Sequence, residues 1–417
     1  MRVVVGIVAG ALITLLTLWL CRGEQARSPA LADEPLPARS GPQWNCFRGP
    51  SAGVSPWPDA PIAWDGPSGR GVIWKAPLKM VGVSSPVIWS NRVYITEGND
   101  RERAVLAFDA ASGRQLWRQV VPDGGAGATL PSVTDAGLAL PTPACDQHGV
   151  YALFGTGDLA AFSHQGKLLW RIFLGRPVIG YGFSSSPCLA NGLLLVQFDT
   201  HTNGRVLAVE TATGRIKWEH ERLRGAAWSS PLLIPGAEGK PLVVLNANGS
   251  ITAFDLAGEV VWDLDGVTGE VAPSPAYENG QIFAVNAGSL LLCYRLAKTQ
   301  DKLWQYAENL SNTSSPVATK GLLFMAAGNG SLVCLDALTG EELWTHQFWA
   351  CYASLVVSGD RVYMLGRNGT MQIVAAERSY RLIATCALGE GCDATPALDE
   401  GRIYIRGQNH LWCLGKN

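Results

Sequence analysis

Three aspartates are candidates for acid–base chemistry, because a carboxyl group can exchange protons with a substrate. Asp109, Asp255 and Asp336 each lie seven or eight residues before a tryptophan, within similar stretches of sequence. A catalytic acid is needed once, whereas these residues recur at one position of a repeat. An aspartate side chain also hydrogen-bonds readily to the backbone of its own turn. We therefore interpret all three as turn-forming residues.

The six histidines are scattered, and none is paired at the spacing typical of metal ligands. His164 lies inside a turn of the repeat, and His220 and His346 each follow a tryptophan by two residues. We expect all six histidines at the surface or at strand ends, without a metal ion.

The ten cysteines include no Cys-x-x-Cys, no Cys-x-x-Cys-His and no adjacent pair. This pattern argues against a dithiol redox motif and against attached haem. Cys293, Cys334 and Cys413 stand where other copies of the repeat have alanine, so we predict small buried positions for them. A disulfide between Cys386 and Cys392 is one option in an oxidising compartment.

These residues belong to a repeat that organises the whole chain. Its fullest copy is AFDAASGRQLW, residues 107–117, which predicts a short strand, a tight turn containing Gly113 and a second strand that includes Trp117. Related copies occupy residues 161–170, 208–218, 253–262, 293–304 and 334–344. Six copies of one strand–turn–strand unit indicate a repeat protein.

A second marker, a pair of small residues followed by a proline, opens a short apolar run in each unit. Proline suits the first position of a strand, where no ladder donor is needed. The prolines are at positions 86, 143, 187, 231, 275, 316 and 396, and residues 353–358 form a degenerate member. A period of about 40 residues with about four strands is typical of a propeller blade. The sequence therefore predicts an all-β fold: an eight-bladed β-propeller of four-stranded blades.

The ends of this region predict how the ring closes. The last unit, from residue 394 onward, has about three strands, whereas residues 71–78 form a separate strand that carries Trp74. We predict that residues 71–78 complete the last blade, which removes the free edges of an open ring. The tryptophans expected to dock between blades are Trp74, Trp117, Trp170, Trp218, Trp262, Trp304 and Trp344, with Ile383 in the seventh blade.

The repeat resembles the PQQ-like, quinoprotein-type β-propeller repeat, whose hallmark is A-x-D-x-x-T-G-x-x-x-W. Residues 208–218 and 334–344 keep the T-G-x-x-x-W half of this motif, and the resemblance covers about residues 71–415. Residues 44–55, WNCFRGPSAGVS, resemble the leader that precedes such propellers in many exported bacterial proteins.

The resemblance implies one of two functions. Quinoprotein dehydrogenases hold pyrroloquinoline quinone (PQQ) and calcium at the ring axis through Glu, Asn and Asp, and many carry a vicinal disulfide. This chain has no vicinal cysteines and no acidic cluster in its loops. Other members, such as the BamB-like propeller subunit of the outer-membrane β-barrel assembly machinery, are non-catalytic scaffolds.

We therefore predict a non-catalytic scaffold, without catalytic, cofactor-binding or metal-binding residues, that binds an envelope protein or a small ligand. The alternative is a PQQ- or metal-dependent oxidoreductase with an atypical site. The formal net charge of −2 does not suggest nucleic-acid binding, which requires a basic face. We expect a monomer.

The N-terminal residues predict export. Residues 3–20 carry no charge and follow Arg2, which is typical of an export signal or a signal anchor. Three fates are open: cleavage after Ala32, an uncleaved anchor in the inner membrane, or lipidation at Cys21. We assign residues 1–32 to the signal or anchor, residues 33–70 to a tether and leader, and residues 71–417 to the propeller. Each fate places the propeller in the periplasm or cell envelope.

Loops that lead into the innermost strands of a propeller gather on one face, around the channel. Three of them carry aromatic residues here: Tyr181, Phe183, Trp228, Trp349 and Tyr352. Exposed aromatic clusters are typical of interfaces, so these five residues are candidate contacts for a partner or ligand. The alternative is that their rings plug the channel. The loop at 121–141 is long enough to overhang the same face.

Overall fold

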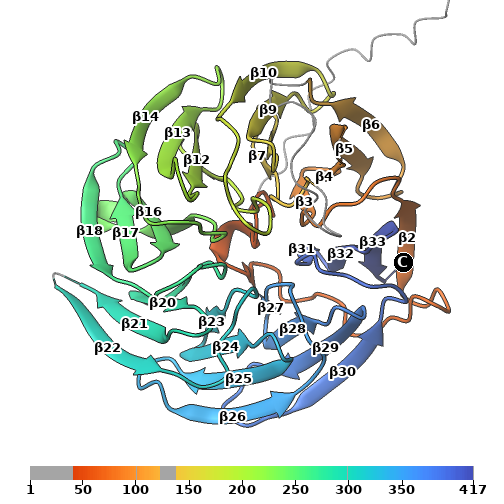
Figure 1. Cartoon of the computed structure of the whole chain (residues 1–417). Helices are drawn as coiled ribbons and strands as arrows, with labels where there is room; N and C mark the ends of the chain where they lie inside the picture. The colour runs from red at the N-terminus through yellow and green to blue at the C-terminus, as the bar shows by residue number, and fades with distance from the viewer. Residues whose placement is uncertain (1–40, 100, 123–137, 298, 417) are drawn as a thin grey trace, which may run out of the picture. The chain divides into compact units, whose positions relative to one another are not determined.

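The computed structural model describes residues 41–99, 101–122, 138–297 and 299–416. These residues form eight β-sheets arranged as blades around a central axis (Figure 1). The predicted all-β, eight-bladed propeller is therefore confirmed.

The first four blades follow one another along the chain, and the strands of each run from the innermost to the outermost. Blade 1 contains β3 (Val87–Trp89), β4 (Arg92–Gly98), β5 (Arg103–Asp109) and β6 (Gln115–Val120). Blade 2 contains β7 (Ala144–Cys145), β8 (Val150–Leu153), β9 (Asp158–Phe162) and β10 (Leu168–Phe173). Blade 3 contains β11 (Cys188–Ala190), β12 (Leu193–Phe198), β13 (Arg205–Glu210) and β14 (Ile216–Glu221). Blade 4 contains β15 (Leu232–Pro235), the 3-10 turn η2 (Ala237–Gly239), β16 (Pro241–Ala247), β17 (Ser250–Phe254) and β18 (Val260–Asp265).

The other four blades complete the ring. Blade 5 contains β19 (Ala276–Glu278), β20 (Gln281–Val285), β21 (Leu291–Leu296) and β22 (Gln300–Tyr306). Blade 6 contains β23 (Val317–Thr319), β24 (Leu322–Ala326), β25 (Ser331–Asp336) and β26 (Glu342–Gln347). Blade 7 contains β27 (Val356–Ser358), β28 (Arg361–Leu365), β29 (Thr370–Ala375) and β30 (Leu382–Ala387). Blade 8 contains β31 (Ala397–Asp399), β32 (Arg402–Arg406), β33 (His410–Gly415) and, as its outermost strand, β2 (Val72–Pro77).

The ring closes as predicted, through an N-terminal strand. β2 pairs antiparallel with β33, and the register runs from Val72 opposite Leu414 to Pro77 opposite His410. Residues from the two ends of the propeller thus share one sheet, which leaves no incomplete blade.

Neighbouring strands of a blade are antiparallel, so successive connections alternate between two faces of the ring. The loop face carries the connections from each outermost strand to the next innermost strand, together with the turns between second and third strands. The opposite turn face carries the turns of the sequence repeat. There Asp109, Asp255 and Asp336 accept backbone N–H groups of their own turns, as the sequence predicts.

The repeat tryptophans dock against the turn of the following blade. The indole N–H of Trp117 donates to the carbonyl oxygen of His164 (2.8 Å), and that of Trp170 donates to the carbonyl oxygen of Thr211 (2.7 Å). Equivalent bonds to the next turn are made by Trp74, Trp218, Trp304 and Trp344. Trp262 is buried in the apolar cluster between blades 4 and 5.

The turn glycine makes room for this docking. Gly214 has a φ of +72°, and a Cβ atom there would lie 2.7 Å from the ring of Trp170. A side chain at this position would therefore be strained and would also collide with the tryptophan of the preceding blade. Each T-G-x-x-x-W motif thus takes part in two contacts. Its glycine packs against the tryptophan of the preceding blade, and its tryptophan docks on the turn of the following blade.

A closed ring of hydrogen bonds joins all eight blades where the innermost strands begin. In each blade the residue before the marker proline, or before Leu355 in blade 7, is a serine or threonine. Its hydroxyl oxygen accepts the backbone N–H of the equivalent residue in the preceding blade. The eight members are Ser85, Thr142, Ser186, Ser230, Ser274, Ser315, Ser354 and Thr395.

Residues 43–66 belong to the segment assigned from the sequence to a tether and leader: residues 43–55 pack within the ring, and residues 57–66 continue against blades 7 and 8. The backbone oxygens of Trp44 and Asn45 accept N–H groups of Ile88 (2.7 Å) and Cys145 (2.8 Å), on the innermost strands of blades 1 and 2. After the 3-10 turn η1 (Gly49–Ser51), β1 (Val54–Ser55) pairs in parallel with β27 of blade 7. Figure 1 shows this segment, in red, at the centre of the ring.

Arg48 extends the leader to the other side of the axis. Its Nη1 donates to the carbonyl oxygen of Pro275 (3.0 Å), and its Nη2 donates to Ala52 (2.7 Å) and to Pro316. Burial lowers the pKa of Arg48 to about 9. Because the leader bonds to blades 1, 2, 5, 6 and 7, it is the leader, and not the aromatic loops, that plugs the channel.

The expectation that His164 lies at the surface is wrong. His164 is buried between blades 1 and 2, where its Nδ1 lies 2.6 Å from Oη of Tyr94 and its Nε2 lies 2.8 Å from the backbone oxygen of Asp146. Nε2 can only donate to a carbonyl oxygen, so in the neutral imidazole Nδ1 is left to accept from the hydroxyl of Tyr94. Burial lowers the pKa of His164 to about 4.

The cysteines of the described residues are all free thiols. Cys293, Cys334 and Cys413 are fully buried, as predicted. The optional disulfide between Cys386 and Cys392 is not formed, because the two thiols point to different partners. Cys386 Sγ donates to the backbone oxygen of Ile62 (3.4 Å), and Cys392 Sγ donates to that of Arg406 (3.0 Å).

Candidate functional site

The five aromatic residues predicted to form a contact face differ widely in exposure. Tyr181 is 76% exposed, Trp349 59% and Tyr352 42%, whereas Trp228 is partly buried. Phe183 must be removed from the set: it is fully buried and packs on Phe198, with ring centroids 4.9 Å apart. Gly182, with a φ of +84°, turns the backbone between Tyr181 and Phe183, and the two side chains end in different environments.

Tyr181 and Trp228 form one patch on the loop face, at the entry to blades 3 and 4. Their ring centroids are 6.0 Å apart, and the indole N–H of Trp228 donates to the backbone oxygen of Gly182 (2.6 Å). The backbone N–H of Trp228 donates to Val271 (2.8 Å) in the next loop. Three successive loops are therefore braced together, and they hold the exposed ring of Tyr181 in place.

Leu223 lies near the start of the loop that also carries Trp228, and it was missed in the sequence. It is 75% exposed in the loop that leads into blade 4. Its signal in the sequence is a leucine between two arginines, Arg222 and Arg224, in the loop that ends at the marker proline Pro231. We call Tyr181, Leu223 and Trp228 the blade 3–4 patch.

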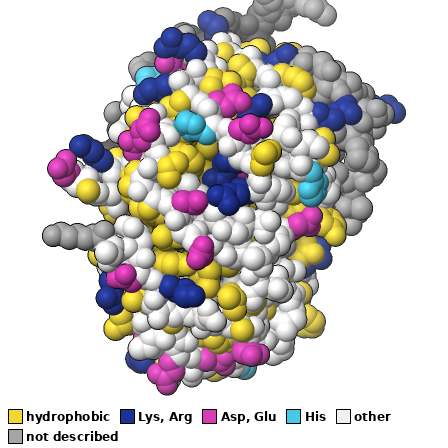
Figure 2. All heavy atoms as spheres, turned by 60° about the vertical axis from the view of Figure 1, so that its left-hand side comes forward, with side chains coloured by type: hydrophobic (Ala, Val, Ile, Leu, Met, Phe, Trp, Pro, Cys, Tyr) yellow, Lys and Arg dark blue, Asp and Glu magenta, His cyan; other side chains and the backbone are white. Residues whose placement is uncertain are grey.

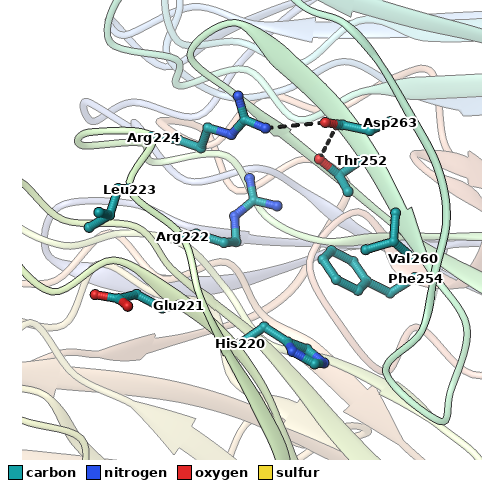
Figure 3. A pocket seen from close by; sticks show the side chains of 9 residues that line it. All are labelled: His220, Glu221, Arg222, Leu223, Arg224, Thr252, Phe254, Val260 and Asp263. Atoms are coloured by element: carbon teal, nitrogen blue, oxygen red, sulfur yellow. Dashed lines mark hydrogen bonds and ion pairs between the residues drawn. The ribbon is translucent and has the colours of Figure 1, made fainter.

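A cavity adjoins the blade 3–4 patch, between β14 of blade 3 and β17 and β18 of blade 4 (Figure 3). Arg224 points across it and bonds to Asp263 (3.1 Å), whose other carboxylate oxygen accepts the hydroxyl of Thr252 (2.7 Å). Phe254 and Val260 line its apolar wall. Figure 2 shows this side of the molecule, where hydrophobic side chains alternate with charges of both signs.

A buried ion pair supports the floor of this cavity. Arg222 and Asp199 are both buried, with Nε and Oδ1 3.2 Å apart. Burial raises the pKa of Asp199, while the charge of Arg222 opposes that effect. Arg222 is thus held in place by Asp199, and Arg224 is left to face the surface.

Trp349 and Tyr352 form a separate patch on the loop that leads into blade 7. Arg367 lies over the ring of Tyr352, 4.0 Å from its centroid, and bonds to both carboxylate oxygens of Asp393 at 2.8 and 3.1 Å. Blades 3 and 7 lie on opposite sides of the axis (Figure 1). The fold therefore places the predicted aromatic residues on one face but does not bring them into one cluster.

The axis does not fit the PQQ and calcium of quinoprotein dehydrogenases. Among residues 41–99, 101–122, 138–297 and 299–416, no three His, Cys, Asp or Glu side chains are grouped so that they could hold a metal ion. At the axis, the carbonyl oxygens of Pro275 and Pro316 accept the guanidinium of Arg48. A buried arginine repels a cation, so these residues do not form a calcium site.

Several sequence predictions concern residues that the structure does not describe: the signal or anchor at 1–32 with Cys21, residues 33–40, and residues 123–137 of the long loop. Within the described part of the chain, no helix is long and apolar enough to cross a membrane.

The sequence matches the protein family described as outer membrane protein assembly factor BamB, over residues 58–178, 102–346 and 203–417. One curated relative is outer membrane protein assembly factor BamB of Moranella endobia strain PCIT. It is 23% identical over 331 residues, which cover 77% of this chain and 71% of the relative.

Two solved structures share the fold. BamB from Moraxella catarrhalis has a TM-score of 0.63 at 13% identity and covers 83% of this chain and 97% of its own. The quinohemoprotein alcohol dehydrogenase ADHIIG from Pseudomonas putida HK5 has a TM-score of 0.63 at 14% identity. The match covers 83% of this chain and 76% of the dehydrogenase chain. Since BamB and an alcohol dehydrogenase have the same TM-score, the shared fold does not choose between their functions.

Proposed function

This chain belongs to the outer membrane protein assembly factor BamB family, and we propose that it is an exported, non-catalytic scaffold that binds a protein partner in the cell envelope. The observation that carries the proposal is the blade 3–4 patch. Tyr181 and Leu223 are each about three-quarters exposed on loops that hydrogen bonds brace. Large apolar side chains held rigidly in water are typical of protein interfaces.

The surroundings of the patch support a protein partner. An interface combines apolar anchors with a polar rim, and the ion pair of Arg224 and Asp263 provides such a rim beside Leu223. The adjoining cavity, with Phe254 and Val260 on its wall, is suited to one apolar side chain of the partner.

The oxidoreductase alternative receives less support. Arg48 places a buried positive charge at the axis, whereas a calcium–quinone site needs acidic ligands there. We expect that PQQ and calcium added to the purified protein produce no alcohol- or sugar-dependent dye reduction. A quinohemoprotein alcohol dehydrogenase assayed in parallel is the positive control, and dye reduction that requires added PQQ would overturn the non-catalytic assignment.

Export is part of the proposal and rests on residues 3–20, which are apolar and uncharged. Cleavage after Ala32, retention as an inner-membrane anchor and lipidation at Cys21 remain the three options for this segment. Mass spectrometry of the mature N-terminus distinguishes them, because each leaves a different terminal peptide.

Site-specific photocrosslinking tests the partner site. A photoreactive amino acid at position 223 should give an adduct with one envelope protein in living cells. The matched control is position 338, because Leu338 is also exposed, at 59%, but lies on the turn face of blade 6. Tyr181→Ala should abolish the adduct at 223. Equal adducts at 223 and 338, or none at 223, would contradict the proposed interface.

A further inference from the structure

The patch at blade 7 has a different chemistry from the blade 3–4 patch, and we propose that it binds an uncharged oligosaccharide. We call it the blade 7 platform and define it by Trp349, Tyr352, Arg367, Asn368 and Asp393. The proposal is independent of the protein partner proposed above, because it concerns another part of the loop face.

The platform presents an exposed indole on a loop whose backbone is hydrogen-bonded on both sides. The backbone N–H of Phe348 donates to Gly330 (2.9 Å), and the backbone N–H of Arg367 donates to Ala350 (2.8 Å). The loop that carries Trp349 is therefore bonded on both sides to second-to-third-strand turns, one in blade 6 and one in blade 7. A loop whose backbone is already fixed loses little conformational entropy when it binds a ligand.

Glycines allow these turns to approach the loop. A Cβ atom on Gly330 would lie 2.6 Å from the carbonyl carbon of Trp349, and one on Gly366 would lie 3.0 Å from the Cβ atom of Trp349. Neither position has room for a side chain without moving the loop. The exposure of Trp349 is thus built into the surrounding backbone rather than being the result of a loose loop.

Polar groups of both kinds lie around the rings. The guanidinium of Arg367 lies over the ring of Tyr352 and donates through Nε and Nη2 to the carboxylate of Asp393. Asn368 and Trp349 both lie beside Gly366. A Cβ atom on Gly366 would be 2.9 Å from Oδ1 of Asn368 and 3.0 Å from the Cβ atom of Trp349. Its Oδ1 accepts the backbone N–H of Thr370 (3.0 Å), which fixes the orientation of the amide.

These features match a sugar better than an anion. The charge of Arg367 is balanced by Asp393, so the platform has no surplus positive charge for a phosphate or sulfate. The C–H face of a pyranose can stack on an aromatic ring, whose face is electron-rich, while its hydroxyls need mixed donors and acceptors.

Saturation-transfer NMR and calorimetry with the purified full chain test this proposal. The probes are three neutral tetrasaccharides: maltotetraose, cellotetraose and chitotetraose. At least one should bind saturably, and Trp349→Ala should weaken its binding at least tenfold with an unchanged melting temperature. The matched control is Tyr181→Ala, which removes an exposed ring from the other patch and should leave sugar binding unchanged.

A second variant tests the role of charge. Asp393→Asn should weaken binding of the neutral sugar, because it releases Arg367 from its paired position, and should not introduce salt-dependent binding of the neutral probe. The proposal is overturned if none of the three probes binds saturably, if Trp349→Ala leaves binding intact, or if only sulfated oligosaccharides bind. A photoreactive residue at position 349 that crosslinks to one specific protein would also overturn the proposal, because the platform would then bind a protein and not a sugar.

Discussion

The backbone N–H of Thr395 donates to Oγ of Ser85, 3.1 Å away and 310 residues distant in the sequence. This bond completes the ring of eight hydrogen bonds in which each blade binds the next through one serine or threonine. The closing strand β2 joins the same two ends of the propeller at its outer edge. The ring is therefore closed twice: near the axis by a hydroxyl and at the rim by a strand.

Removing one hydroxyl from this ring should destabilise the protein. Ser230→Ala leaves the buried backbone N–H of Ser186 without its acceptor, which costs about 1–3 kcal/mol. The control is Ser229→Ala, because Ser229 is also buried but its Oγ has no hydrogen-bond partner among the described residues. Urea denaturation should show a loss for Ser230→Ala and little or no loss for Ser229→Ala. Equal losses would show that the ring bond is not what stabilises this position.

A second prediction isolates the contact between glycine and tryptophan. Gly214→Ala should destabilise the protein more than Gly249→Ala. Both glycines have positive φ, at +72° and +74°, so the backbone strain of roughly 1–2 kcal/mol is shared. Only at Gly214 would the new Cβ meet a tryptophan ring, 2.7 Å away, whereas nothing lies within 4 Å at Gly249. If the two variants have the same denaturation midpoint, the docking contact does not require glycine.

The leader should behave as part of the folded ring. Trp44→Ala is expected to cost about 3–5 kcal/mol in urea denaturation, because it removes a fully buried aromatic side chain. Trp349→Ala is the control, since Trp349 is mainly exposed and its loss should change stability by less than about 0.5 kcal/mol. A loss below about 1 kcal/mol for Trp44→Ala would show that the leader packs loosely in the channel.

The stability of the protein should depend on pH through His164. The pKa of His164 is lowered to about 4 in the folded protein, against about 6.5 when unfolded. Between these values the unfolded chain binds a proton that the folded protein does not, so stability falls as the pH drops from 6.5 to 4. The lowered pKa corresponds to a loss of at most about 3 kcal/mol at the acid end.

Denaturation at a series of pH values checks this expectation. His164→Gln should flatten the pH dependence between pH 6.5 and 4, although it also lowers stability at pH 7 by disturbing the bond to Tyr94. His148→Gln is the control, because His148 is exposed and its substitution should leave the slope unchanged. A slope that persists in His164→Gln would assign the pH dependence to other groups.

The sequence alone determined the number of blades, the closing strand and the docking positions of the tryptophans. This was possible because a propeller repeats one local contact: Gly214 receives Trp170 in the same way that Gly113 receives Trp74. A spacing that is repeated along the chain can be recognised without knowing the partner of any one residue. The serines and threonines before the marker prolines could also be recognised in the sequence, but their role could not. Each hydroxyl accepts the backbone N–H of a residue about 40 positions earlier, in the preceding blade.

Only the tertiary structure decided which residues face the solvent and which fill the channel. Tyr181 and Phe183 lie on one loop, yet one is exposed and the other buried, because Phe198 in the neighbouring sheet covers Phe183. The leader could not be placed from its own residues, since Arg48 bonds to Pro275, 227 positions later. Such contacts depend on the closed ring, which brings distant segments together and sets the burial of each side chain.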